Sequence, residues 1–228
     1  MAFQGRDGPS PLRLMGVASQ CVLPLPAVAS PLALIMLPHG HVPLARPPGP
    51  VLGRRHARFD PVMVRPNIPT SKRVSYALGY LGLGLIEQAS EELEAVEGDD
   101  RLSIPVMLAR IELYMAAKNW DLLIAVAKGV ARADPSHEQA WIGWAYALRC
   151  LERTAEARAV LLEAEPHHGK QSALLHYNLA CYECLLGDMA KAKTRLRRAC
   201  KMGGTEFKTL ALDDPDLQAM WEEIGRMG

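Results

Sequence analysis

The pair Cys181 and Cys184 is the arrangement in this 228-residue sequence that most suggests chemistry, and Cys150 precedes it by 31 residues. Two residues three apart on a helix share a face, so the two sulfur atoms of the pair would lie together. A redox-active pair sits at a helix N-terminus, where the thiolate is stabilised, whereas this pair falls in the middle of a helical pattern. A structural zinc site needs four ligands, and His176 is the one further candidate nearby. We therefore expect no metal and no cofactor here, and interpret these cysteines as small apolar residues.

Other clusters of reactive residue types lack the spacing that catalysis needs. His167 and His168 supply two metal ligands at most, which is too few for a site. Glu91 and Glu92 are adjacent, so their carboxylates would face different directions on a helix. The sequence also has no glycine-rich phosphate loop, no nucleophile elbow and no His-Glu-x-x-His pair. We therefore predict that the protein is not an enzyme and has no catalytic residues.

A basic cluster is the third chemically distinctive feature. Six positive side chains fall within eleven residues, namely Lys191, Lys193, Arg195, Arg197, Arg198 and Lys201. No aromatic residues interleave them, and the formal net charge of the whole chain is only +1. Nucleic-acid binders carry a larger basic excess. We therefore expect no nucleic-acid binding, and interpret the cluster as a solvated outer face that could attract an acidic partner or an anionic surface.

Composition also bears on the compartment. No run of 18 apolar residues is free of proline, so we predict no membrane insertion. Five cysteines form an odd number without the paired spacing of a secreted scaffold, which favours a reducing compartment. We expect a cytoplasmic protein, with export as the alternative if the amino-terminal segment is a genuine signal.

Residues 1–69 differ in composition from the rest of the chain, and we predict that they form no domain. Residues 1–70 hold 13 of the 17 prolines and seven arginines, but no lysine or glutamate. One interpretation is a secretory signal, with Arg6 and Arg13 ahead of apolar residues and a cleavage site at residues 27–29. A second is a disordered, proline-rich arm. The third, which fits the composition best, is that translation starts near Met63 and that the upstream text is non-native.

A period of 34 residues runs through the rest of the chain. Four anchor residues are spaced 34, 34 and 35 apart: Ala89, Leu123, Ala157 and Ala192. Four residues after each anchor lie Leu93, Ala127, Leu161 and Leu196. Three residues further on lie Val96, Val130, Ala164 and Ala199, so both sets are apolar or small. Twelve residues before each anchor lie Ala77, Ile111, Ala145 and Ala180. Between these residues and the anchors lie Gly84, Lys118, Glu152 and Gly187. This self-similarity predicts helical hairpins with a turn at the last four positions. We assign the extra residue of the last interval to a longer connection at residues 166–169.

The repeats resemble the tetratricopeptide repeats. The fourth copy is the clearest, with Tyr177-Asn178-Leu179-Ala180, then Gly187-Asp188, Ala192, Leu196 and Ala199. The second copy has Tyr114, Trp120 and Asp134-Pro135, and the third has Trp141, Ala145, Ala157 and Ala164. Ile111, Leu123 and Glu183 depart from the family's pattern. The resemblance implies an all-α helix-hairpin solenoid of bacterial type within residues 70–228, with four repeats at 70–103, 104–137, 138–172 and 173–206.

The end of the chain carries a further helix signal. Asp214 and Pro215 offer an N-cap and a first-turn proline for a short helix. Its apolar face would consist of Leu217, Met220, Trp221 and Ile224. Because a terminal repeat has no successor to stack on, we predict that this helix caps the solenoid.

In tetratricopeptide proteins the first helix of each hairpin lines a concave groove that binds partners. Carried over to this sequence, the resemblance implies a partner-binding groove that includes Glu112, Tyr146, Arg149, Tyr177, Asn178 and Cys181. Only Arg149 and Asn178 resemble the clamp with which some members hold a terminal carboxylate, so we expect a peptide or helix with apolar anchors. The implied function is a non-catalytic protein–protein interaction module, an adaptor or scaffold for an unknown protein or peptide. The alternative is a structural or self-associating component, including a homo-oligomer, of an envelope or secretion assembly.

Overall fold

The computed structural model describes residues 68–226. Within this range there are ten α-helices, two short 3-10 helices, η1 and η2, and no strand. All of these residues belong to one compact unit of the chain. The predictions for the amino-terminal segment at 1–69 lie outside the described residues, apart from its last two positions.

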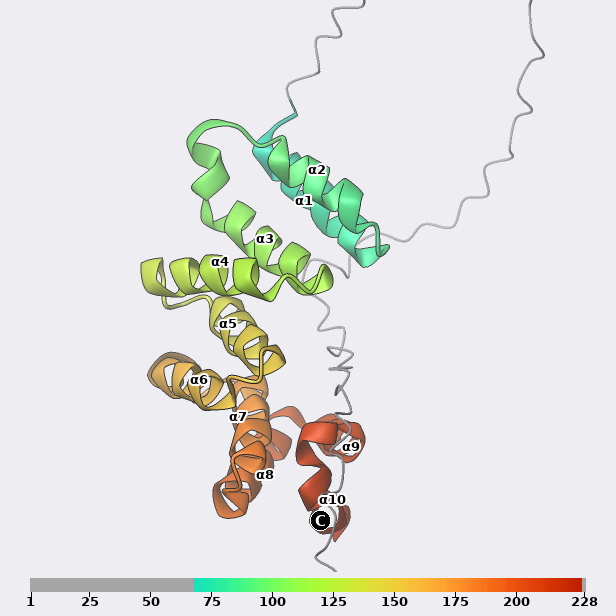
Figure 1. Cartoon of the computed structure of the whole chain (residues 1–228), viewed down its shortest axis with the longest axis vertical. Helices are drawn as coiled ribbons and strands as arrows, with labels where there is room; N and C mark the ends of the chain where they lie inside the picture. The colour runs from blue at the N-terminus through green and yellow to red at the C-terminus, as the bar shows by residue number, and fades with distance from the viewer. Residues whose placement is uncertain (1–67, 227–228) are drawn as a thin grey trace, which may run out of the picture. The chain divides into compact units, whose positions relative to one another are not determined.

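The first eight α-helices form four antiparallel hairpins (Figure 1). These are α1 (Thr70–Gly82) with α2 (Ile86–Glu94), α3 (Ile104–Ala116) with α4 (Trp120–Ala133), α5 (Glu138–Cys150) with α6 (Thr154–His168), and α7 (Ala173–Leu185) with α8 (Met189–Gly203). The first helix of every hairpin has 13 residues. Between the first two hairpins lies η1 (Gly98–Leu102). The all-α solenoid and the predicted register of its hairpins are therefore confirmed.

The turn inside each hairpin has the same backbone conformation. Gly84, Lys118, Glu152 and Gly187 adopt φ angles of 74°, 54°, 61° and 84°. This left-handed region costs a residue with a Cβ atom about 1–2 kcal/mol, and glycine almost nothing. Two hairpins thus make the turn with glycine, and two make it with a strained lysine or glutamate.

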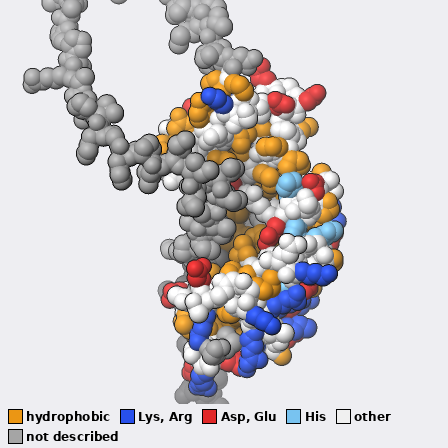
Figure 2. Space-filling model, turned by 180° about the vertical axis from the view of Figure 1, so that it is seen from behind, with side chains coloured by type: hydrophobic (Ala, Val, Ile, Leu, Met, Phe, Trp, Pro, Cys, Tyr) orange, Lys and Arg blue, Asp and Glu red, His pale blue; other side chains and the backbone are white. Residues whose placement is uncertain are grey.

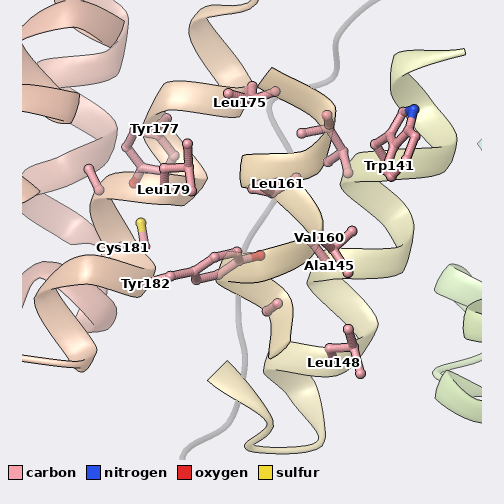
Figure 3. Close-up of a cluster of buried hydrophobic side chains, with 14 of the residues drawn as sticks. Trp141, Ala145, Leu148, Val160, Leu161, Leu175, Tyr177, Leu179, Cys181 and Tyr182 are labelled. Atoms are coloured by element: carbon pink, nitrogen blue, oxygen red, sulfur yellow. The ribbon is translucent and has the colours of Figure 1, made fainter. Parts of the chain in front are cut away.

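The core follows the predicted stripes. All sixteen residues of the periodic pattern are buried, although Val96 lies just beyond the end of α2. Alanine is frequent at these positions, so neighbouring helices can approach closely. Figure 3 shows the larger side chains that fill the remaining space, with Tyr182 reaching from α7 toward Ala145 and Val160.

The connection predicted at residues 166–169 is wrong. Pro166 lies inside α6, which continues to His168, so the helix itself absorbs the extra residue of the interval. Contacts with α5 and with the connection that precedes it hold this last turn in place. The ring of His167 stacks on Trp141 with centroids 6.5 Å apart, and His168 Nε2 donates a hydrogen bond of 2.9 Å to the carbonyl of Pro135.

After the fourth hairpin the chain forms α9 (Thr205–Asp213), η2 (Pro215–Met220) and α10 (Trp221–Arg226). The predicted cap is present as the last two of these elements, and α9 was not predicted. Asp214 caps η2 by accepting a 2.9 Å hydrogen bond from the backbone N–H of Asp216. The apolar residues Leu217, Met220 and Ile224 are buried. The segment from α9 to α10 packs against α7 and α8, where a fifth hairpin would otherwise stack.

Candidate partner-binding face

The predicted site residues come from the first helices of three successive hairpins. Glu112 on α3 is half-buried, and its carboxylate accepts a hydrogen bond from the side-chain amide of Gln139 on α5. Burial raises the pKa of Glu112 above its ordinary value, and the bond from Gln139 lowers it by less. The carboxylate therefore lies in a partly dehydrated environment, where an added hydrogen bond is worth more than it is in water.

Tyr146 lies one repeat after Glu112, on α5. It is half-buried, and its ring meets Trp120 edge-on, with centroids 5.9 Å apart and an interplanar angle of 75°. Such edge contacts favour one ring orientation. Leu108 and Met115 on α3 are also partly buried and pack on the core. We call the half-exposed set Leu108, Glu112, Met115, Gln139 and Tyr146 the first-helix face.

Arg149, also on α5, is bound to the carboxy-terminal segment. Its Nε and Nη2 atoms donate to the two carboxylate oxygens of Asp216 at 2.9 and 2.6 Å. The side chains of this pair are only 12% and 18% exposed. A planar two-bond pair of this kind fixes both partners. Asp216 thus binds the guanidinium group that the sequence suggested as part of a clamp for a ligand's carboxylate.

Tyr177 and Cys181 on α7 are buried beneath the same segment. The hydroxyl of Tyr177 donates a 2.6 Å hydrogen bond to the carboxylate of Asp214, and the thiol of Cys181 lies 3.5 Å from the same oxygen. Their exposed fractions are 1% and 2%. Both were expected to face a ligand, but in this structure the chain's own residues cover them. The reason is that the last hairpin has an apolar inner side and no following hairpin to cover it.

Asn178 serves its own helix. Its side-chain amide donates a 3.0 Å hydrogen bond to the carbonyl of Leu174, one turn earlier, and the residue is 6% exposed. Of the six predicted groove residues, Glu112 and Tyr146 are therefore the two that lie, partly exposed, on the first-helix face.

The cysteines of the described chain have the environment of packing residues. Burial raises the pKa of the Cys181 thiol well above its ordinary value, and the nearby Asp214 carboxylate adds to the effect. Burial raises the pKa of Cys184 as well. A neutral thiol is a poor nucleophile and a poor metal ligand. Between residues 68 and 226, no three His, Cys, Asp or Glu side chains are placed to hold a metal ion together.

His176 is buried in a hydrogen-bonded network. Its Nε2 donates to the carbonyl of Gly169 at 2.7 Å, and its Nδ1 lies 3.2 Å from a guanidinium nitrogen of Arg195. Burial lowers the pKa of His176 below its ordinary value. The imidazole is therefore neutral, with its proton on Nε2, and holds the connection between α6 and α7 in place.

Comparisons with known proteins agree with this geometry. No protein-family model matches the sequence, and no curated protein matches it. A solved structure, TTC0263, is described as a thermophilic TPR protein in Thermus thermophilus, and this chain is similar to it with a TM-score of 0.57 and 16% sequence identity. The similarity covers 69% of this chain and 84% of that one. The chain has the tetratricopeptide fold.

Two further solved structures are less similar to this chain. The structure titled MamA AMB-1 and a mutant of MamA each have a TM-score of 0.37 and 17% identity to this chain. They cover 59% and 58% of this chain, and 91% and 96% of their own lengths. In the part of this tetratricopeptide chain that the structure describes, no helix is both long and apolar enough to cross a lipid bilayer.

Sequence reasoning missed the two residues that organise the carboxy-terminal half of this tetratricopeptide domain. Asp214 was expected to cap a helix, which it does, but its carboxylate also binds Tyr177. Asp216 does not belong to the predicted apolar face of the terminal helix, and it pairs with Arg149. The available signal was an acidic pair around Pro215 opposite inner-helix positions that carry hydroxyl and guanidinium groups.

Proposed function

We propose that the protein is a non-catalytic interaction module, and that its first-helix face binds a peptide segment or helix of another protein. The observation that carries the proposal is the composition of that face. Partly buried apolar side chains, Leu108, Met115 and Tyr146, share this face with a hydrogen-bonded polar pair, Glu112 and Gln139. Apolar anchors with a few fixed polar groups are the usual composition of a peptide-binding surface.

The surface is also preorganised for binding. Trp120 restrains the ring of Tyr146, and Gln139 restrains the carboxylate of Glu112. Because both side chains are already ordered, binding costs mainly the conformational entropy of the ligand. Since Arg149 is paired with Asp216, the face favours apolar anchors with a hydrogen-bond donor for Glu112 over a terminal carboxylate.

A peptide selection tests this proposal without knowledge of the natural partner. The full chain is used to select binders from a random library of short peptides, and their affinities are measured by calorimetry. We expect apolar peptides with a donor group, and about tenfold weaker binding to Tyr146→Ala, as for an aromatic residue at the centre of an interface. Leu162→Ala, at an exposed leucine on α6, is the matched control. Equal affinity for the two variants would refute the assignment of the face.

The compartment forms part of the proposal. Cys181, Cys184 and Cys200 are free thiols. Free thiols fit a reducing environment, so we propose that the protein works in the cytoplasm. Fractionation of cells that express it from its own gene checks this placement, and recovery in an extracytoplasmic fraction would contradict it.

A second candidate function is self-association, and a separate observation favours it. Four large apolar side chains in the first hairpin are strongly exposed: Tyr76 at 46%, Leu78 at 42%, Leu83 at 74% and Leu85 at 40%. Clustered exposed apolar residues mark contact surfaces more often than isolated ones do. A second copy of the chain that covers them would give a homo-oligomer.

Sedimentation analysis of matched variants tests the second candidate. Leu83 and Leu186 occupy the same position after the first helix of the first and fourth hairpins. If the first hairpin mediates self-association, Leu83→Glu shifts the protein toward the monomer, and Leu186→Glu does not. A wild-type protein that is monomeric at all accessible concentrations excludes this candidate.

A further inference from the structure

The six cations of α8 do not form one uniform solvated face. Four of them have partners within the protein, and one of these, Lys193, pairs with Glu223 on α10. Lys191 pairs with the residue that caps the start of α8, and Arg195 pairs with Glu165 on α6. Arg198 donates a 2.7 Å hydrogen bond to the carbonyl of Gly169. Lys191, Arg195 and Arg198 stabilise the fourth hairpin and its connection to the third.

The other three cations lie in a row. Lys193, Arg197 and Lys201 are spaced four residues apart, so they occupy one ridge of the helix. This ridge forms one wall of a cavity of about 640 Å³ between α8, α9 and α10. The remaining lining residues are Cys200, Gly204, Thr205, Lys208, Glu223 and Arg226. Figure 2 shows that lysine and arginine side chains gather over this carboxy-terminal end of the described chain.

The charge of the cavity is strongly positive. Among the described residues, five lysine and arginine side chains line it together with the carboxylate of Glu223, which pairs with Lys193, while Arg226 pairs with Glu222. Like charges that converge on one hollow repel one another, and an anion placed among them relieves this repulsion. Arg197 and Lys201 are exposed to solvent, so an incoming ligand reaches them without displacing part of the fold.

The start of α9 adds donors to the same cavity. Gly204, with φ of 79°, and Thr205 are the N-cap and first residue of this nine-residue helix, and no side chain caps it. The uncapped N–H groups of a first helical turn carry partial positive charge and bind anions. The start of α9, Thr205 and cationic side chains therefore line the same space.

We propose that this cavity binds a ligand with two or more linked phosphate groups. A phosphate ester carries about −1.5 to −2 charges at neutral pH, so two of them balance the net charge of the lining. The volume is that of a small-molecule site. None of the described residues that line the cavity is aromatic, which means that the phosphates, and not a stacked base, determine recognition. An extended acidic peptide fits less well, because its successive side chains point to opposite faces.

This site is independent of the first-helix face. It lies on α8, α9 and α10, whereas the proposed peptide surface lies on α3 and α5. Failure of either proposal therefore leaves the other untouched.

Calorimetry on the full chain with inorganic tripolyphosphate, at constant ionic strength, tests the phosphate site. The cavity variant combines Arg197→Gln with Lys201→Gln. The control combines Arg101→Gln with Lys170→Gln, which removes two exposed cations outside the cavity and gives the same change in net charge. We expect one-to-one binding to the wild type and the control, and about a hundredfold loss for the cavity variant, since each charge-assisted contact is worth about tenfold. Equal affinity for the cavity and control variants would overturn the proposal.

Two further measurements distinguish the source of the phosphates from a different ligand class. If the wild type sediments with phosphatidylcholine vesicles that contain phosphatidylinositol bisphosphate, and the cavity variant does not, the ligand is a lipid headgroup. Tripolyphosphate binding without vesicle binding assigns a free phosphorylated molecule. If an oligoglutamate peptide binds at least as tightly as tripolyphosphate, the cavity is an acidic-peptide site and the phosphate assignment is wrong. Far-UV spectra of both variants check that these exposed substitutions leave the fold intact.

Discussion

Replacing Asp214 by alanine removes two kinds of stabilisation at once. The carboxylate of Asp214 caps η2 through the backbone N–H of Asp216 at 2.9 Å. It also accepts the 2.6 Å hydrogen bond from the hydroxyl of Tyr177 on α7. Asp214 is 2% exposed and Tyr177 is 1% exposed, so water does not replace the lost acceptor. The substitution therefore acts on the contact that joins the carboxy-terminal segment to the last hairpin.

The size of the effect follows from these two contributions. Loss of an N-cap costs about 1 kcal/mol. A buried hydroxyl left without a partner costs about 1–3 kcal/mol. For a domain of this size each kcal/mol lowers the melting temperature by about 2–4 °C. We therefore expect Asp214→Ala to lower the unfolding free energy by about 2–4 kcal/mol and the melting temperature by about 10 °C.

Thermal unfolding monitored by far-UV circular dichroism measures this loss. The control is Asp213→Ala, which removes the same side chain from the adjacent exposed position and is expected to change stability by less than about 0.5 kcal/mol. Asp214→Ala made in a Tyr177→Phe background removes both partners of the hydrogen bond. In that background Asp214→Ala should lower the unfolding free energy by at least about 1 kcal/mol less than it does in the wild type.

Two results would refute this reasoning. If Asp214→Ala melts within a degree or two of Asp213→Ala, the carboxy-terminal segment does not stabilise α7. If the costs of the aspartate and tyrosine substitutions simply add, the two side chains are not coupled, and the buried hydrogen bond contributes nothing.

Three further predictions concern other parts of the fold. Gly187→Ala places a Cβ atom at φ of 84° and should destabilise the protein by about 1 kcal/mol. Gly129→Ala, within α4 with open space around it, should stabilise the protein by about 0.5–1 kcal/mol. Urea titrations that give the same sign for both variants would contradict the turn assignment. Because burial lowers the pKa of His176 in the folded state, the unfolded chain takes up a proton first as pH falls below about 6.5, and stability should fall with it. His176→Gln should flatten that slope, and an unchanged pH profile would argue against a buried, neutral histidine. Because burial raises the pKa of Glu112, Glu112→Gln should raise the melting temperature at neutral pH. The variant should lose this advantage near pH 4, as the carboxyl becomes protonated in both the folded and the unfolded state. A variant that is less stable than the wild type at neutral pH would refute the expected direction of the effect.

Much of the fold could be predicted because its determinants are local and repeat. A left-handed turn and a small or apolar anchor recur every 34 residues, so weak signals such as Lys118 and Glu152 gain support from Gly84 and Gly187 at equivalent positions. The connection around Pro166 was mispredicted because proline usually ends a helix. Stacking of His167 on Trp141 of α5, the other helix of the same hairpin, supports the last turn of that helix.

The candidate site was harder to predict because it depends on which surfaces remain uncovered. The repeat register correctly places Tyr146 and Cys181 at equivalent positions, but nothing in that register indicates that the carboxy-terminal segment returns to cover Cys181. Likewise, the basic run of α8 gives no local indication that Arg195 turns toward Glu165 while Arg197 faces a cavity. Both outcomes depend on contacts with segments that are distant in sequence.

Site-specific photo-crosslinking tests the central claim most directly. A benzophenone-bearing phenylalanine is placed at position 146 on the first-helix face, and at position 162 on the exposed side of α6 as the control, in the full chain expressed in its own cells. If the first-helix face binds a partner, illumination gives one discrete heavier adduct from position 146 and none from position 162, and mass spectrometry of that adduct identifies the partner. The same adducts from both positions, or an adduct from position 162 alone, would contradict the claim that this face is the binding surface.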